Sequence, residues 1–311
     1  MVKEPVPMAK KSRPLLTVMI ILLGVAIVLG STLLLALHFF SPSATILFKE
    51  KIGVVSITGT ISSSKTISSQ LVKFAEDESI KAIILRINSP GGGVGATQEI
   101  YREVQKIIPR KPVVASMGSV AASGGYYVAA TATKIVANPG TITGSIGVFI
   151  QFVRLEELLN KIGVDLEIVK SGEFKDMGSP DRKLTERDRE ILNALIEDLQ
   201  GQFVSAVATG RNLSVEKVKE IADGRIFSGA RAKDLGLVDF MGNFQDTVQI
   251  TKELLGIKGD VALVYPKKST GEWWNLFLES SARHLVGAMA EKGGRAEYRW
   301  NGFGNTASGS Y

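Results

Sequence analysis

The sequence predicts an α/β fold with a parallel sheet and flanking helices, preceded by one N-terminal transmembrane helix. From residue 51 onward, short runs rich in valine and isoleucine alternate with amphipathic helical patterns. This alternation is typical of parallel strands joined by right-handed helical crossovers. Before that region, residues 15–40 form one apolar run without Asp, Glu, Lys or Arg.

The apolar run 15–40 is long enough to cross a membrane, because about 20 helical residues span the hydrocarbon core. A cleaved signal peptide would have a shorter apolar core, and Pro42 makes the residues after the run a poor cleavage site. A buried core helix is the other alternative. The residues just after the run are uncharged, so the positive-inside rule places 1–14 in the cytoplasm and the rest outside. The basic residues before the run are Lys3, Lys10, Lys11 and Arg13.

The expected strands are short and mostly apolar on both faces, which is typical of buried parallel strands. They are 53–57, 82–87, 112–116, 134–137 and 165–169. The helices expected between them are 66–76, 96–108 and 119–131.

A longer helix should follow Thr185, which forms a capping-box pattern with Asp188, and should end at Gly210 as its C-cap. A second helix is expected over 215–222. The long helix carries an apolar stripe that we interpret as intramolecular core rather than a subunit interface. The stripe is Ile191, Leu195, Leu199, Phe203 and Val207.

Composition excludes several kinds of chemistry. The 311 residues include no cysteine, so disulfides, thiolate metal sites and a cysteine nucleophile are excluded. The net charge of +6 is spread along the chain without a dense basic block, so we expect no nucleic-acid partner. The two histidines, His38 and His284, lie near the two ends, so the central region is expected to work without imidazole. No cofactor or metal is expected either.

Two glycine-rich segments follow expected strands. The first, NSPGGG at 88–93, can present backbone N–H groups to a ligand oxygen, as a phosphate cradle or an oxyanion hole. It does not match the Walker pattern. The second, SMGSVAASGGYY at 116–127, places serines at the start of a helix, where N–H groups can stabilise an oxyanion. From chemistry alone, Ser116, Ser119 and Ser123 all remain candidate nucleophiles, and close helix packing is the alternative reading of this segment.

A serine nucleophile needs a base, and the third segment, VKSGEFKDMGSP at 169–180, supplies lysines. A lysine acts as a base only when burial or a cationic neighbour lowers its pKa from about 10.4 toward about 7–8. Residue chemistry does not choose between Lys170 and Lys175.

These segments together resemble the signal peptide peptidase A (SppA) family of serine peptidases in its short bacterial form. The matching stretches are INSPGGG at 87–93, SMGSVAASGGYYVA at 116–129, TGSIGV at 143–148, KSGEFKDMGSP at 170–180 and ADGRIFSGARAKDLGLVD at 222–239. The resemblance implies a Clp-protease/crotonase-like fold and hydrolysis of signal-peptide remnants and other unfolded membrane-associated peptides. It also implies a location in the bacterial cytoplasmic membrane.

By motif, the resemblance implies that Ser123 is the nucleophile and Lys175 the general base of a Ser–Lys dyad. It implies that Ser145 orients the lysine and that the N–H groups of Gly92 and Gly124 form the oxyanion hole. It further implies a homo-oligomeric ring in which neighbouring protomers share each site. An acyl-CoA hydratase or isomerase of crotonase type, a membrane scaffold and a stomatin-associated membrane peptidase are the competing interpretations.

The predicted organisation has five parts. They are a cytoplasmic N-terminus (1–14), a transmembrane helix (15–40), a linker (41–50), the peptidase domain (51–260) and a partly disordered C-terminal extension (261–311).

Overall fold

The computed structural model describes residues 14–40, 49–266 and 296–299. The chain divides into two compact units, 1–49 and 50–311. In the first unit, α1 (Pro14–Phe40) is a continuous helix. Side chains are described for residues 18, 19 and 21–36 of α1, and its large apolar side chains among these are exposed.

Among the described residues, no helix is long and apolar enough to cross a membrane.

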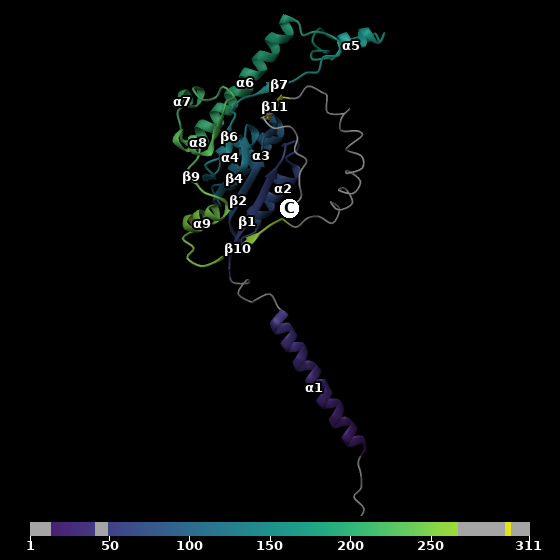
Figure 1. Cartoon of the computed structure of the whole chain (residues 1–311), viewed down its shortest axis with the longest axis vertical. Coiled ribbons are helices and arrows are strands. Elements are labelled where there is room, and N and C mark those ends of the chain that lie inside the picture. The colour runs from purple at the N-terminus through teal and green to yellow at the C-terminus, as the bar shows by residue number, and fades with distance from the viewer. Residues whose placement is uncertain (1–13, 41–48, 267–295, 300–311) are drawn as a thin grey trace, which may run out of the picture. The chain divides into compact units, whose positions relative to one another are not determined.

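The second unit is built on a parallel sheet, as predicted (Figure 1). The strand order is β10-β1-β2-β4-β5-β9, and every neighbouring pair in this row is parallel. A short strand, β6, pairs in parallel with the far end of β4, and β8 pairs antiparallel with β6. The bounds are β1 (Glu50–Thr58), β2 (Ile80–Ser89), β4 (Val113–Ala122), β5 (Lys134–Ala137), β6 (Ile142–Gly144), β8 (Ile226–Ser228), β9 (Phe240–Met241) and β10 (Val261–Val264).

Helices cover both faces of this sheet, as buried parallel strands require. One face carries the larger core cluster, to which helices α2, α3, α4 and α6 contribute buried apolar side chains. The other face packs Ile52, Val54 and Ile84 against Val248 of α9. The helices are α2 (Lys65–Glu76), α3 (Val94–Ile107), α4 (Gly124–Ala130), α5 (Glu156–Lys161), α6 (Glu186–Arg211), α7 (Val215–Lys219), α8 (Gly229–Asp234) and α9 (Phe244–Leu255).

A second, antiparallel sheet has the order β3-β11-β7. Its strands are β3 (Gly91–Gly93), β7 (Phe149–Ile150) and β11 (Ala296–Arg299). The backbone of β11 therefore lies between the first glycine-rich segment and β7, with Tyr298 opposite Gly92 and Glu297 opposite Phe149.

We call residues 151–195 the arm. It contains α5, the loop that follows and the first part of α6, and it projects from the sheet in Figure 1. In the arm, the expected strand 165–169 is wrong. These residues are exposed and adopt no strand, because the described structure offers them no neighbouring strand to pair with.

Two further expected boundaries are also wrong. The helix expected over 119–131 begins only at Gly124, because residues 120–122 still pair with β6 as part of β4. Gly210 is not the C-cap of α6, whose cap is Asn212 in the left-handed conformation. Gly210 instead lies inside the helix, where an added Cβ would come 2.1 Å from the carbonyl oxygen of Ala130. Glycine there allows α6 to pack closely on the end of α4.

Candidate active site

Ser123 occupies the turn between β4 and α4. Its φ of 52° and ψ of −119° are unusual for a residue with a side chain. Two backbone hydrogen bonds hold it there, because its N–H donates to the carbonyl of Gly144 at 2.8 Å and its carbonyl accepts from Tyr127 at 2.8 Å. Strain of this kind persists only where the surrounding structure fixes the backbone, and it is common at functional sites.

Ser145 lies beside Ser123 because their strands are paired. Ala122 at the end of β4 is in register with Gly144 at the end of β6, and the two serines follow directly. Ser145 also has a positive φ, 50°, and its N–H donates to the carbonyl of Arg225 at 2.8 Å. Within the described residues, neither serine hydroxyl forms a hydrogen bond, and both residues are largely buried.

The first glycine-rich segment is a neighbour of the Ser123 turn. Strand β3 contacts α4, and a Cβ on Gly125 would lie 2.8 Å from the carbonyl oxygen of Ser89. Gly92 has no room for a side chain either, because its Cβ would lie 2.2 Å from the carbonyl oxygen of Ile61. As the first residue of α4, Gly124 has an N–H without an acceptor inside its helix. Strand β3 and the start of α4 thus lie side by side at the Ser123 turn.

Buried aromatic side chains fix α4 beneath this turn. The hydroxyl of Tyr126 donates to the carbonyl of Leu237 at 2.9 Å, and burial raises the pKa of this phenol. The ring of Tyr127 packs between Tyr101, at 5.0 Å between ring centroids, and Phe203, at 4.8 Å. The helix that follows the Ser123 turn is therefore buried along its whole length.

The other two candidate serines have different surroundings. Ser116 is buried, and its hydroxyl accepts hydrogen bonds from Arg86 at 3.1 Å and Thr247 at 3.0 Å. Ser119 is exposed within β4 and is not followed by a helix. Of the three serines, only Ser123 stands at a strand-to-helix turn beside other site groups.

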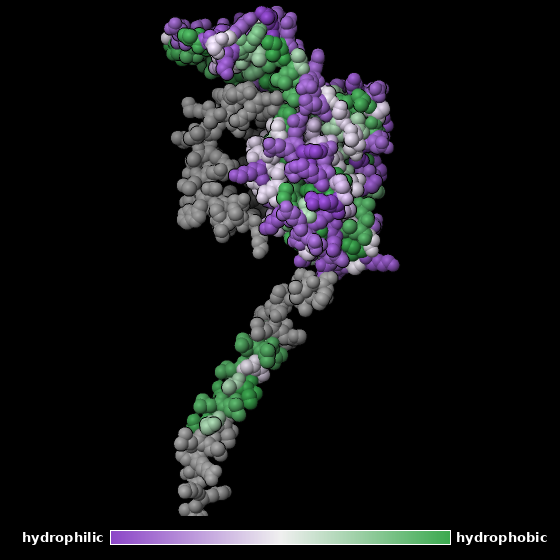
Figure 2. Space-filling view, turned by 180° about the vertical axis from the view of Figure 1, so that it is seen from behind, coloured by the Kyte–Doolittle hydropathy of each residue, from purple (hydrophilic) through white to green (hydrophobic). Residues whose placement is uncertain are grey.

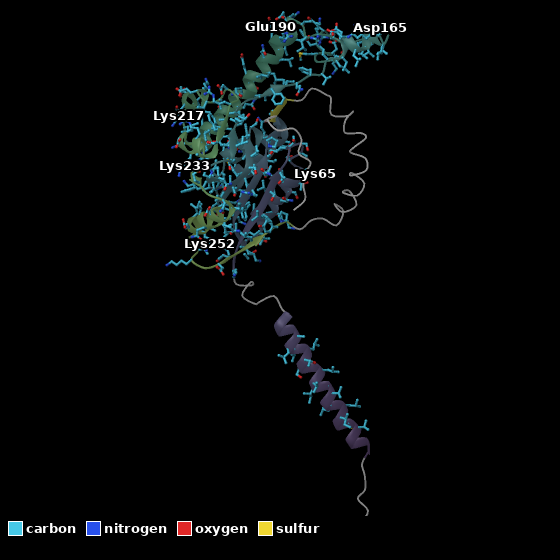
Figure 3. The ribbon with its side chains drawn as sticks, viewed as in Figure 1. Lys65, Asp165, Glu190, Lys217, Lys233 and Lys252 are labelled. Atoms are coloured by element: carbon cyan, nitrogen blue, oxygen red, sulfur yellow. The ribbon has the colours of Figure 1, made fainter. Side chains whose placement is uncertain are left out.

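Lys175 lies on the arm and not beside Ser123. It falls between Asp165 and Glu190, both of which are labelled at the arm in Figure 3. Its side chain is exposed and forms no hydrogen bond or ion pair with the described residues. Within one chain, Ser123, Ser145 and the glycine-rich strand β3 therefore lie together, whereas Lys175 lies apart from them on the arm.

Lys170, the alternative lysine, is held in an ion pair. Its Nζ contacts both carboxylate oxygens of Asp176 at 2.9 Å and donates to the carbonyl of Glu173 at 3.1 Å. Arg182 contacts the same Asp176 carboxylate at 2.8 Å. The sequence did not predict these ion pairs. It did predict the capping box of Thr185 and Asp188 beside them, and that prediction is confirmed.

Among the described residues there is no group of three or more His, Cys, Asp or Glu side chains that could hold a metal ion.

Comparison with known proteins agrees with this architecture. The model of peptidase family S49 matches residues 106–258, and that of Clp protease matches residues 38–141. A putative protease of Synechocystis is 47% identical over 213 residues, which cover 68% of this chain and 77% of the relative. A putative signal peptide peptidase SppA of Enterococcus faecium is 39% identical, over 65% of this chain and 59% of the relative. The chloroplastic serine protease SPPA of Arabidopsis thaliana is 34% identical, over 67% of this chain and 33% of the relative.

The matches define an α/β protein with a Clp-protease-like domain. The chain belongs to peptidase family S49, and it is a serine peptidase.

Proposed function

We propose that this peptidase is a membrane-anchored endopeptidase with a Ser–Lys dyad, in which Ser123 is the nucleophile and Lys175 the general base. One observation carries the assignment of the nucleophile: Ser123 is held at a positive φ in a strand-to-helix turn, next to Ser145 and against a glycine-rich strand. Such a turn presents a hydroxyl together with the N–H groups that follow it.

The reaction is acyl transfer in two stages. The Ser123 Oγ attacks the peptide carbonyl carbon while Lys175 accepts the hydroxyl proton, and the N–H groups of Gly92 and Gly124 stabilise the oxyanion. The intermediate collapses as Lys175 returns the proton to the leaving amine, which leaves an acyl ester on Ser123. Water, deprotonated by Lys175, then hydrolyses the ester and frees the serine. Ser145 accepts a hydrogen bond from the lysine and orients it.

The charges around Lys175 support its role over that of Lys170. A base must hold a free electron pair, and a carboxylate in contact would favour the ammonium form. Asp176 is occupied by Lys170 and Arg182, and Glu173 pairs with Arg187 at 3.2 Å. Both acidic neighbours of Lys175 in the third segment therefore have other cations as partners.

We further propose that each site is shared between protomers of a ring. This accounts for the separation of Lys175 from Ser123 within one chain. It also gives a role to the exposed apolar side chains of the arm, which a second copy of the chain would cover. These side chains are Leu158, Ile162, Val164, Leu166, Ile168, Val169, Ile191 and Leu195.

The substrates we propose are cleaved signal peptides and other unfolded peptides at the membrane. Support comes from β11, whose backbone already lies as an extended strand between β3 and β7. An extended peptide could pair with the same two strands and bring its carbonyl to Ser123. The uncharged apolar run 15–40 of the sequence would supply the anchor and leave the larger unit outside the cytoplasm.

The experiment compares the full chain in detergent micelles with its Ser123→Ala and Ser119→Ala variants. We expect Ser123→Ala to lose peptide hydrolysis by about 10⁴-fold or more and to lose labelling by a fluorophosphonate. Ser119→Ala should keep both. Hydrolysis by Ser123→Ala at the rate of the unsubstituted protein would show that the nucleophile is assigned wrongly.

A further inference from the structure

The segment that carries Lys175 has almost no apolar core beneath it. Between Ile146 and Leu192, no apolar side chain of the described structure belongs to the buried core. Local turns shape the segment, with hydrogen bonds from the N–H of Lys175 to the carbonyl of Gly172 at 3.2 Å and from Met177 to Phe174 at 3.1 Å. Such turns are weak alone, so the position of Lys175 must depend on polar contacts with a firmer element.

Arg182 supplies such a contact, because it joins the Lys175 segment to the N-terminus of α6. Its Nη2 donates to Asp176, next to Lys175, at 2.8 Å, and its Nη1 donates to Asp188, in the first turn of α6, at 2.6 Å. The side chains of Asp176 and Asp188 are only 9% and 1% exposed, whereas that of Arg182 is 25% exposed. Charge-assisted hydrogen bonds with little exposure are the strong kind.

The far end of this connection is firmly held. Asp188 accepts from the N–H of Thr185 at 2.9 Å and its own N–H donates to the Thr185 hydroxyl at 3.1 Å, which completes the capping box of α6. The same helix buries Phe203 and Val207 in the core of the sheet. Arg182 thus connects the Lys175 segment, which buries no apolar side chain in the core, to helix α6, which does.

Arg182 also restrains the carboxylate nearest to Lys175 in sequence. Asp176 is held by Arg182 on one side and by Lys170 on the other. If Arg182 were absent, one carboxylate oxygen would lose its arginine partner and become available to another cation. Lys175 carries the adjacent amine.

We propose that Arg182 is a positioning residue of the peptidase: it fixes the Lys175 segment on the N-terminus of α6 and keeps Asp176 away from the Lys175 amine. The proposal rests on the proposed role of Lys175 as the base. Arg182 itself touches neither substrate nor Ser123. Besides Lys175, the charged side chains of 170–188 and of the strip 152–157 facing it are Arg154, Glu156, Glu157, Lys170, Glu173, Asp176, Asp181, Arg182, Lys183, Glu186, Arg187 and Asp188.

The experiment uses the full chain in detergent micelles and measures kcat, KM and the pH dependence of kcat for one fluorogenic peptide. In Arg182→Gln, the displaced segment should lower kcat by about 10²-fold with little change in KM. The rise of kcat with pH should move by about one unit to higher pH, because the released Asp176 favours the ammonium form of Lys175.

Three variants make this result specific. Arg189→Gln is the matched control, since Arg189 also lies near the N-terminus of α6 but pairs with the exposed Glu186 of the same helix at 3.9 Å, and it should leave kcat and the pH profile unchanged. Arg182→Gln combined with Asp176→Asn should return the pH profile to its original position without restoring kcat. Arg182→Lys keeps the charge but cannot contact two carboxylates with one planar guanidinium, so its kcat and pH profile should lie between those of the original protein and of Arg182→Gln. It replaces Arg182→Gln in the test if that variant does not fold.

Unchanged kcat in a folded Arg182→Gln would overturn the proposal. So would a lower kcat without a shift of the pH profile, because a purely structural loss would leave that profile in place. Lys175→Ala is measured beside them. If Lys175→Ala stays active, the Ser–Lys mechanism itself has failed, and that outcome is distinct from failure of the role of Arg182.

Discussion

The sheet body and the arm differ in what holds them together. In the body, Ser123 lies in a turn fixed by two strands, a packed helix and close glycine contacts. In the arm, turns and ion pairs hold the segment that carries Lys175, and the arm exposes apolar side chains, which are green at the top of Figure 2. The proposed nucleophile is therefore positioned by the chain itself, whereas the proposed base depends on charge contacts and on a surface that the chain leaves uncovered.

This contrast separates two requirements of catalysis. A strained turn needs surroundings that overdetermine it, and only a packed core provides them. A lysine base needs to lose water without gaining a carboxylate partner. The proposed ring would meet the second requirement, because a partner protomer that covers the arm would remove water from Lys175.

The largest effect expected from this comparison concerns Lys175. Lys175→Arg keeps the cation but cannot accept a proton, so we expect peptide hydrolysis to fall by about 10³-fold while Ser123→Ala and Lys175→Arg both fold normally. Full activity of Lys175→Arg in the steady-state peptide assay would show that Lys175 is not the general base.

Mixing Ser123→Ala chains with Lys175→Ala chains tests whether Ser123 of one protomer works with Lys175 of another. Ser123→Ala chains carry an intact arm and Lys175→Ala chains carry an intact Ser123. Some interfaces in a mixed assembly would hold both groups, so activity should partly return when the two are combined before assembly. If mass spectrometry shows mixed assemblies that remain inactive, the site is not shared.

The next effect concerns the apolar surface of the arm. Leu166 and Val169 are 54% and 94% exposed, so replacing both with Asn should not disturb the core of the body. If a second copy covers them, the loss of their burial should raise the concentration needed for assembly by about tenfold or more. Analytical ultracentrifugation and activity on dilution would measure this.

The matched control for that pair is Val72→Asn on α2, because Val72 is also an exposed apolar residue, at 39%, but belongs to the body. It should change neither assembly nor activity. Equal weakening of assembly by Val72→Asn and by the double substitution would show that the arm has no special role.

A smaller effect concerns β11, which pairs with both β3 and β7, the strand just before the arm. If peptide substrates bind as a strand at this place, β11 competes with them. Deleting 296–311 should then lower KM by a few-fold and leave kcat nearly unchanged. A deletion that raises KM would instead mean that β11 helps to form the peptide site.

The sequence predicted the body better than the arm. The apolar runs that became β1, β2, β4 and β5 predicted the parallel sheet, because a buried parallel strand has a distinctive composition. The motif resemblance singled out Ser123, and residue chemistry alone left Ser116 and Ser119 open. Only the structure shows that β4 continues to Ala122 and that the turn follows it, since this depends on the pairing with β6.

The stripe of α6 shows why the arm was harder to predict. Its regular spacing predicted a single core-facing surface, yet Phe203 and Val207 are buried while Ile191 and Leu195 are 40% and 44% exposed. Periodicity identifies an apolar face but not what covers it. The ion pairs of Arg182 were equally hidden, because they depend on how a loop folds back on a helix.

The smallest effect expected is a loosening of the arm in acid while the body stays folded. Arg182, followed by the N–H of Thr185, lowers the pKa of Asp188 to about 2 from its ordinary value of 3.8. A carboxylate whose pKa is lower in the folded state stabilises that state above about pH 4, and this stabilisation is lost as the pH falls toward about 2. The arm should lose its order over the same interval, since Asp188 anchors Arg182.

Pepsin, which is active in acid, can measure this loosening. Cleavage within 170–188 should accelerate between pH 4 and pH 2, relative to an unfolded reference peptide, while cleavage in β2 and β4 should not. The exposed pair of Asp223 and Arg225 in the body is also broken over this interval, but exposed pairs contribute little. Arg182→Gln should already be cleaved quickly at pH 4, because its Asp188 has lost the guanidinium. Equal cleavage of arm and body at every pH would mean that the ion network does not set the order of the arm.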